Sequence, residues 1–357
     1  LYTPEERAGI QGYLSSVWGI SAVIGPLAGG VIVERLSWPW VFWINLPIGV
    51  ATIAGLMVYL HEGVEHHAHK VDYLGSVFFA VGISALLGAL TQASQPSNTG
   101  SLALAFAAIA AFSLGLFVWQ ERRAREPMLS LELWTHRVIA SANGATLAAG
   151  MTLIGVTTFL AVYVQAVMGY SATVAGFALT MMAVGWPVAS TLSRRFYNWI
   201  GMRSTLRVGS VFLILGGLVF YLLEPTSSPA LAGLGSMLMG FGMGLLNTAV
   251  ILLVQGSVEW RQRGSATASN LFSRNLGSTL GAAVLGTALN LALKDAGVAP
   301  EAIRRLLDDA PKGDLSHLRA ALDQGLHLTF GLVVLLSVGT LALALFIPDR
   351  TLDELSK

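Results

Sequence analysis

Six side chains in the second half of the sequence carry amide or guanidinium groups in or beside long apolar runs: Asn143, Asn247, Gln255, Asn270, Arg274 and Asn275. Polar groups are costly inside a bilayer, and by default they mark the path of a substrate or an ion. Amide side chains also form hydrogen bonds that hold membrane helices together. For the five amides, the sequence leaves open both a role in a cavity and interhelical hydrogen bonding.

Arg274 is the most informative of the six, because a guanidinium keeps its proton in proteins and must face protein, water or a lipid headgroup. One interpretation is that its side chain lines a cavity or locks a gate. The other is that the side chain snorkels to the membrane surface on the side of Gly264. The sequence alone does not separate these two interpretations.

The composition requires that most of the surface avoid water. The 357 residues are 54% hydrophobic and 11% charged, and the mean hydropathy is +0.66, whereas soluble domains carry about 25% charged residues. We therefore expect an all-α transmembrane bundle in a lipid bilayer. The chain has no cysteine, which excludes disulfides and thiolate sites, and a net charge of +1 without a basic block indicates no nucleic-acid partner.

A hydropathy window of about 19 residues predicts about ten spans that must position these side chains. They cover residues 10–33, 41–60, 73–91, 102–119, 138–164, 172–192, 206–223, 230–254, 265–289 and 325–347. Residues 300–309, between the last two spans, suit a short amphipathic helix.

The short connections alternate in charge. Those after the fourth, sixth and eighth predicted spans hold nearly all of the short-loop arginines, and those after the third, fifth and seventh hold no lysine or arginine. By the positive-inside rule, the arginine-rich connections and both ends of the chain should be cytoplasmic.

The first predicted span is rich in small residues at a regular spacing: Gly12, Ser21, Gly25, Pro26, Gly29 and Gly30. This spacing resembles the antiporter motif of the major facilitator superfamily, although Ser21 stands where that family usually has glycine. Shorter segments resemble the same family: 44–49, 71–75, 121–133, 169–171 and 274–277 followed by Gly281.

Over its whole length the chain resembles the fourteen-span drug:proton antiporters of the EmrB/QacA type, without their first four spans. On that plan, residues 1–60 hold the last two spans of the N-terminal bundle. Residues 61–137 hold two extra linker spans and a cytoplasmic loop. Residues 138–357 form a complete six-span C-terminal bundle with a long extracytoplasmic loop at about 292–324.

The resemblance implies a secondary transporter in the bacterial cytoplasmic membrane. It would export amphipathic or cationic small molecules in exchange for protons, by alternating access of two bundles. A periplasmic adaptor protein is a further candidate partner. Two alternatives remain: export of a siderophore, an antibiotic or a lipid, and a truncated fragment that transports nothing.

Proton coupling cannot be assigned to any residue from the sequence. The family's acidic residue in the first span and its arginine in the fourth are not in this chain, and no Asp or Glu falls at the middle of a predicted span. The glycine-rich helix should seal one side of the protein by packing on residues 172–192, which offer Gly176, Ala183, Gly185 and Ala189.

Other chemistries are poorly supported. His61, His66, His67 and His69 invite a zinc site, but a solvated loop explains them better, and they do not form a His-Glu-x-x-His motif. The sequence has no Gly-x-x-x-x-Gly-Lys-Ser/Thr loop for ATP and no complete Gly-x-Ser-x-Gly motif. We therefore expect no enzyme activity, no cofactor and no metal.

Overall fold

The computed structural model describes residues 17, 21, 32, 35–37, 39–59, 72–93, 100–124, 131–298 and 316–347. Within them, nine helices are long and apolar enough to cross a membrane. This confirms the expected all-α transmembrane class. Nearly all of the predicted first span, and the whole of the predicted amphipathic helix at 300–309, lie outside the described residues.

The N-terminal helices are the least packed part of the described chain. Helix α2 (Trp40–Trp43) leads into α3 (Asn45–Tyr59), in which no residue is buried. The side-chain amide of Asn45 donates to the carbonyl oxygen of Val41 at 2.9 Å, which ties the two helices together. An apolar helix that is exposed on all sides needs lipid or further helices around it.

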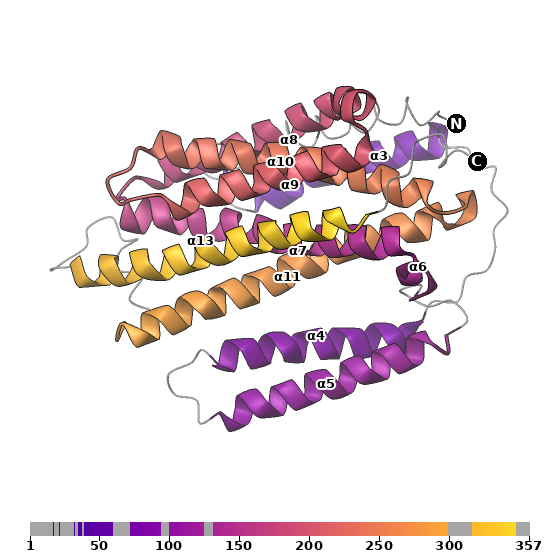
Figure 1. The fold of residues 1–357 in the computed structure, drawn as a ribbon, viewed down its shortest axis with the longest axis horizontal. Coiled ribbons are helices and arrows are strands. Elements are labelled where there is room, and N and C mark those ends of the chain that lie inside the picture. The colour runs from indigo at the N-terminus through magenta and orange to yellow at the C-terminus, as the bar shows by residue number, and fades with distance from the viewer. Residues whose placement is uncertain are drawn as a thin grey trace.

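Helices α4 (Tyr73–Ala93) and α5 (Ser101–Glu121) form a hairpin beside the main bundle (Figure 1). Asp72 fixes the start of α4, because its Oδ1 accepts from the backbone N–H of Gly75 at 2.9 Å and from Nε2 of Gln120 at 3.1 Å. The hairpin contacts α11 where the ring of Phe79 lies 5.0 Å from the ring of Phe272.

Six long helices form the main bundle. They are α7 (Arg137–Val162), which continues as one turn of π-helix η1 (Tyr163–Val167), α8 (Ala172–Ile200), α9 (Met202–Tyr221), α10 (Pro229–Gly256), α11 (Arg263–Asp295) and α13 (Ser316–Leu345). The short helix α6 (Leu131–Thr135) precedes them, and η2 (Trp260–Gln262) links α10 to α11.

Helix α10 is the centre of this bundle, with 72% of its most apolar 18-residue window buried. It packs against α8 and α9, while α7 packs against α11 and α13. The helices approach one another most closely at glycines, which have no side chain. A Cβ atom on Gly240 would collide with the backbone oxygen of Met182 in α8, and one on Gly277 of α11 would collide with the backbone oxygen of Leu147 in α7. Such contacts replace the hydrophobic effect as the source of helix association in lipid.

The helices run beyond the spans predicted from hydropathy. Helix α8 continues to Ile200, and α13 begins at Ser316, nine residues before the predicted start at 325. In this added part of α13, Leu318 and Leu322 are buried. Leucines four residues apart share one face of a helix, so this amphipathic segment is held by packing on the bundle, which a hydropathy average does not detect.

The two ends of the bundle differ in charge. One end carries Arg137, Arg194, Arg195, Arg203, Arg207, Arg261 and Arg263, and we call it the arginine end. There, NH2 of Arg203 donates to the carbonyl oxygen of Leu345 at 3.1 Å and so caps the last turn of α13. The opposite end holds the α7–α8 and α9–α10 connections, the end of α11 and the start of α13.

Candidate functional site

Arg274 turns towards α10. Its backbone lies against α7, because a Cβ on Gly150 would collide with the backbone oxygen of Arg274. Its NH1 donates to Oδ1 of Asn247 in α10 at 3.4 Å, and both side chains are partly buried. The structure therefore favours the placement of Arg274 between two helices over snorkelling to the membrane surface.

The charge of Arg274 is not balanced within the part of the chain that the structure describes, where no carboxylate forms an ion pair with it. A guanidinium has five donors and binds carboxylates and other oxygen acceptors in a fixed geometry. Together with Asn247, it offers donors and one acceptor to a ligand or to a carboxylate on another part of the protein.

A second group of polar side chains, the amide cluster, joins α7 to α11. Asn143 and Asn270 are fully buried. Nδ2 of Asn270 donates to Oδ1 of Asn143 and to Oγ1 of Thr146, each at 3.0 Å, and Nδ2 of Asn143 donates to Oγ of Ser269 at 3.1 Å. Ser269 also accepts from Nε1 of Trp134 at 3.0 Å. The side-chain amides of Asn143 and Asn270 therefore hydrogen-bond to each other and to neighbouring hydroxyls. They link α7 to α11, which is one of the two roles that the sequence leaves open.

Gln255 and Asn275 belong to neither group. Nε2 of Gln255 donates to Oγ1 of Thr267 at 3.1 Å, and its backbone oxygen accepts from Nε of Arg263 at 3.0 Å, so it fixes the corner between α10 and α11. Asn275 is exposed on the surface of the bundle, although it follows Arg274 directly. The structure thus brings together Asn247 with Arg274 and Asn143 with Asn270, and it separates the other two candidates.

The antiporter motif cannot be placed. Gly12, Gly25, Pro26, Gly29 and Gly30 lie outside the described residues, and Ser21 is described as helical and exposed. The four histidines at 61, 66, 67 and 69 also lie outside them. Within the described residues, no group of three or more His, Asp or Glu side chains could hold a metal ion.

The four small residues of α8 that the sequence offers to the glycine-rich helix do not all lie on one free face. A Cβ on Gly185 would lie 2.5 Å from the backbone oxygen of Met237, and Ala189 is fully buried, because α10 occupies that face. Gly176 has no atom within 4 Å of a Cβ position and remains exposed. Gly185 and Ala189 are therefore not available to another helix, whereas Gly176 and the partly exposed Ala183 are.

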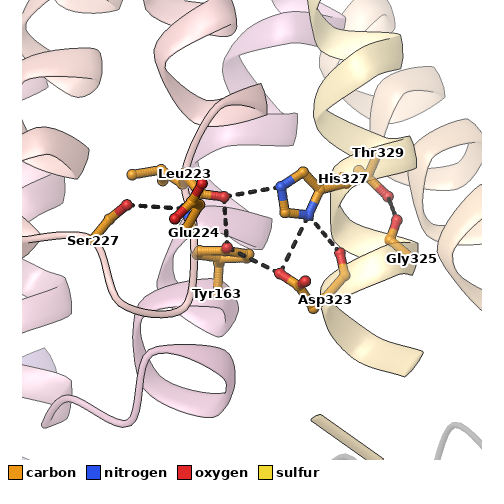
Figure 2. A network of polar contacts seen from close by, with 8 residues as sticks. All are labelled: Tyr163, Leu223, Glu224, Ser227, Asp323, Gly325, His327 and Thr329. Atoms are coloured by element: carbon orange, nitrogen blue, oxygen red, sulfur yellow. Dashed lines mark hydrogen bonds and ion pairs between the residues drawn. The ribbon is translucent and has the colours of Figure 1, made fainter. Parts of the chain in front are cut away.

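The structure also shows a cluster that the sequence did not reveal. Tyr163, Asp323 and His327 meet at the end of the bundle opposite the arginine end (Figure 2). The sequence predicts Asp323 in the loop at about 292–324 and His327 inside the last span, so it does not predict their contact. The signal that could have found them is the spacing of an acid and a histidine by four residues, which puts both on one face of a helix.

Comparisons with known proteins agree with this architecture. The profile of the Major Facilitator Superfamily matches residues 1–282. Multidrug resistance protein 3 of Bacillus subtilis is 32% identical over 289 residues, which are 80% of this chain and 56% of that protein. Multidrug transporter protein MdtP of the same organism is 29% identical over 291 residues, 81% of this chain and 54% of that protein. A probable actinorhodin transporter of Streptomyces coelicolor is 29% identical over 298 residues, 80% of this chain and 52% of that protein. The chain spans about half the length of the curated relatives it matches.

Proposed function

The chain belongs to the major facilitator superfamily, and from that premise we propose that it is the C-terminal part of a proton-coupled exporter of amphipathic small molecules. The superfamily consists of transporters, not enzymes. The names of relatives that cover most of this chain, which include multidrug resistance and multidrug transporter proteins, support export as the activity.

The observation that carries the proposal is the Arg274–Asn247 pair. In this proposal, the face between α10 and α11 lines the substrate pathway. An amphipathic molecule would bind there through its apolar surface and through an acceptor that takes a hydrogen bond from Arg274. A cationic substrate would need carboxylates elsewhere along the pathway, because a fixed positive charge repels it.

We further propose the membrane arrangement. The arginine end would face the cytoplasm of a bacterial cell, since basic residues are retained on that side. Residues 1–60 would complete an N-terminal bundle, and α4 with α5 would be the two linker spans of a fourteen-span plan. The positions of α4 and α5 as a hairpin apart from the six-helix bundle support that plan (Figure 1).

The glycine-rich helix would then pack on the exposed face of α8. Gly176, Ala183, Pro187 and Thr191 of α8 are each exposed or partly exposed and recur at spacings that share one face. We expect Gly25→Leu to abolish efflux while membrane insertion is retained. Gly115→Leu is a matched control, since a Cβ at Gly115 has no atom within 4 Å. Unchanged efflux in Gly25→Leu would refute this contact.

The experiment for the function is dye efflux from pump-deficient bacteria that express the protein. We use ethidium as a cationic dye and carboxyfluorescein as an anionic one, each with and without a proton uncoupler. Expression should lower dye accumulation, and the uncoupler should remove the difference. Arg274→Gln should reduce efflux at least about tenfold, whereas Asn275→Ala should not.

Two alternatives give different results. A dedicated exporter of one product, which the name of the actinorhodin relative supports, would leave both dyes untouched and would export only that product. A fragment without transport activity would export nothing under any condition. Efflux that survives the uncoupler would refute proton coupling.

A further inference from the structure

The Tyr163–Asp323–His327 cluster joins three helices at the end opposite the arginine end (Figure 2). Tyr163 comes from η1, at the end of α7, and both Asp323 and His327 come from α13. The phenol oxygen of Tyr163 lies 2.9 Å from the backbone oxygen of Leu223, just past the end of α9, and 3.0 Å from Oδ1 of Asp323. The side chains of His327 and Asp323 are 29% and 25% exposed, so neither is sealed inside the bundle.

The imidazole of His327 faces oxygen atoms on both sides. Its Nδ1 lies 2.8 Å from the backbone oxygen of Asp323 and 3.2 Å from Oδ1 of the same residue. Its Nε2 lies 2.9 Å from the backbone oxygen of Leu223. A neutral imidazole has one N–H group, and its other nitrogen carries a lone pair. In this arrangement, a neutral ring would point that lone pair at an oxygen.

An additional proton removes the conflict. With His327 as an imidazolium and Asp323 as a carboxylate, two ring N–H groups and the hydroxyl of Tyr163 supply three donors for the oxygens of Asp323 and Leu223. The positive ring also lies just beyond the C-terminus of α9, where the helix dipole favours a cation. These contacts are therefore all satisfied when Asp323 and His327 share one proton more than an ionised acid and a neutral imidazole hold.

Other charged or titratable groups lie on α13 and on the elements adjacent to it: Glu224 after Leu223, Tyr221 at the end of α9, Arg319 four residues before Asp323, and Lys294 and Asp295 at the end of α11. The ring of Tyr221 meets that of His327 edge-on at 6.1 Å. Glu224 adds negative charge near Tyr163, whereas NH2 of Arg319 lies 4.0 Å from the Cβ position of Gly169, in the α7–α8 connection. Neither replaces a donor or an acceptor in the contacts above.

We propose that Tyr163, Asp323 and His327 form a proton-binding site at this end of the C-terminal bundle. The bound proton supplies the second ring N–H, and with it the hydrogen bonds that attach α13 to the end of α9 and to η1. Loss of the proton removes one of these bonds and leaves two electron-rich atoms facing each other. The site belongs to this bundle alone, so it does not depend on what the protein exports.

The test is 15N NMR of the protein in lipid nanodiscs, with labelled histidine, between pH 5 and pH 8. The chain has seven histidines, so the signals of His327 are assigned by their loss in His327→Gln. At the acidic end, both ring nitrogens of His327 should carry hydrogens with the shifts of hydrogen-bonded N–H groups. Asp323→Asn replaces the carboxylate that lies 3.2 Å from Nδ1, so the shift of the Nδ1 hydrogen of His327 should change in this variant.

His136 is the matched control, because it is exposed at the other end of the bundle and its ring signals should be the same in both proteins. If Asp323→Asn does not fold, the wild-type protein still decides the question. A single ring hydrogen on His327 at every pH from 5 to 8 would overturn the proposal. Unchanged shifts of the His327 ring hydrogens in a folded Asp323→Asn variant would overturn it as well.

Discussion

The amide cluster and the Tyr163–Asp323–His327 cluster both join helices of the same bundle, but they differ in burial and in chemistry. Asn143 and Asn270 are fully buried and do not titrate. Asp323 and His327 are about one quarter exposed, and both carry ionisable groups. The comparison teaches that polar side chains in one membrane bundle can serve different purposes: the dry cluster holds α7 to α11 at any pH, and the wetter one can bind a proton.

The largest expected effect concerns the packing that supports the dry cluster. Gly277→Leu should destabilise the bundle by about 3 kcal/mol, because its side chain would collide with the backbone of α7 at Leu147. Thermal unfolding in detergent measures this loss. Gly286→Leu on the same helix is the control, since a Cβ at Gly286 has no atom within 4 Å. Equal stability of the two variants would show that the α7–α11 contact is not close.

A smaller effect is expected inside the amide cluster. Asn270→Ala should cost about 1–3 kcal/mol, because it removes two hydrogen bonds and leaves the buried Oδ1 of Asn143 without that donor. The loss should be the same at pH 5.5 and pH 8, since no member of the cluster titrates. Asn275→Ala, at an exposed position, should change stability by no more than about 0.5 kcal/mol. A pH-dependent loss in Asn270→Ala would remove the distinction between the clusters.

The smallest effect is expected at the wetter cluster. Tyr163→Phe removes one hydroxyl, which contacts Leu223 and Asp323. Its cost should be about 0.6 kcal/mol, the average for a hydrogen bond between membrane helices, because His327 still contacts both freed oxygens. Thermal unfolding of this variant and of Asn270→Ala in the same detergent shows which of the two loses more stability. A greater loss in Tyr163→Phe than in Asn270→Ala would reverse the comparison.

Much of the architecture could be predicted from the sequence. Long apolar runs with few charges have one stable form in lipid, so the helical class and the positions of the spans from 41 onward followed from composition and hydropathy. The ends of the helices were less predictable. The start of α13 at Ser316 depends on burial of Leu318 and Leu322 against neighbouring helices, and a hydropathy average does not include such contacts.

The candidate site was predicted only as a set of residues. Arg274 and Asn247 could be predicted as candidates because charged and amide side chains are rare within membrane spans. Their pairing depends on the rotation of α10 and α11, which close glycine contacts determine. Gly185 and Ala189 show the same limit, because small residues on α8 can face either α10 or another helix. The contacts of His327 with Leu223 and Tyr163 could not be predicted, because these partners are distant in the sequence.

The measurement that tests the central claim most directly is substrate protection of a single cysteine at the face between α10 and α11. The chain has no cysteine, so Asn247→Cys and Asn143→Cys each carry one thiol, in the proposed pathway and in the amide cluster. We predict that a water-soluble maleimide labels Asn247→Cys, that an exported dye slows this labelling severalfold, and that Asn143→Cys does not react. Labelling of neither thiol, or labelling of Asn247→Cys that the dye leaves unchanged, would contradict a substrate pathway beside Arg274.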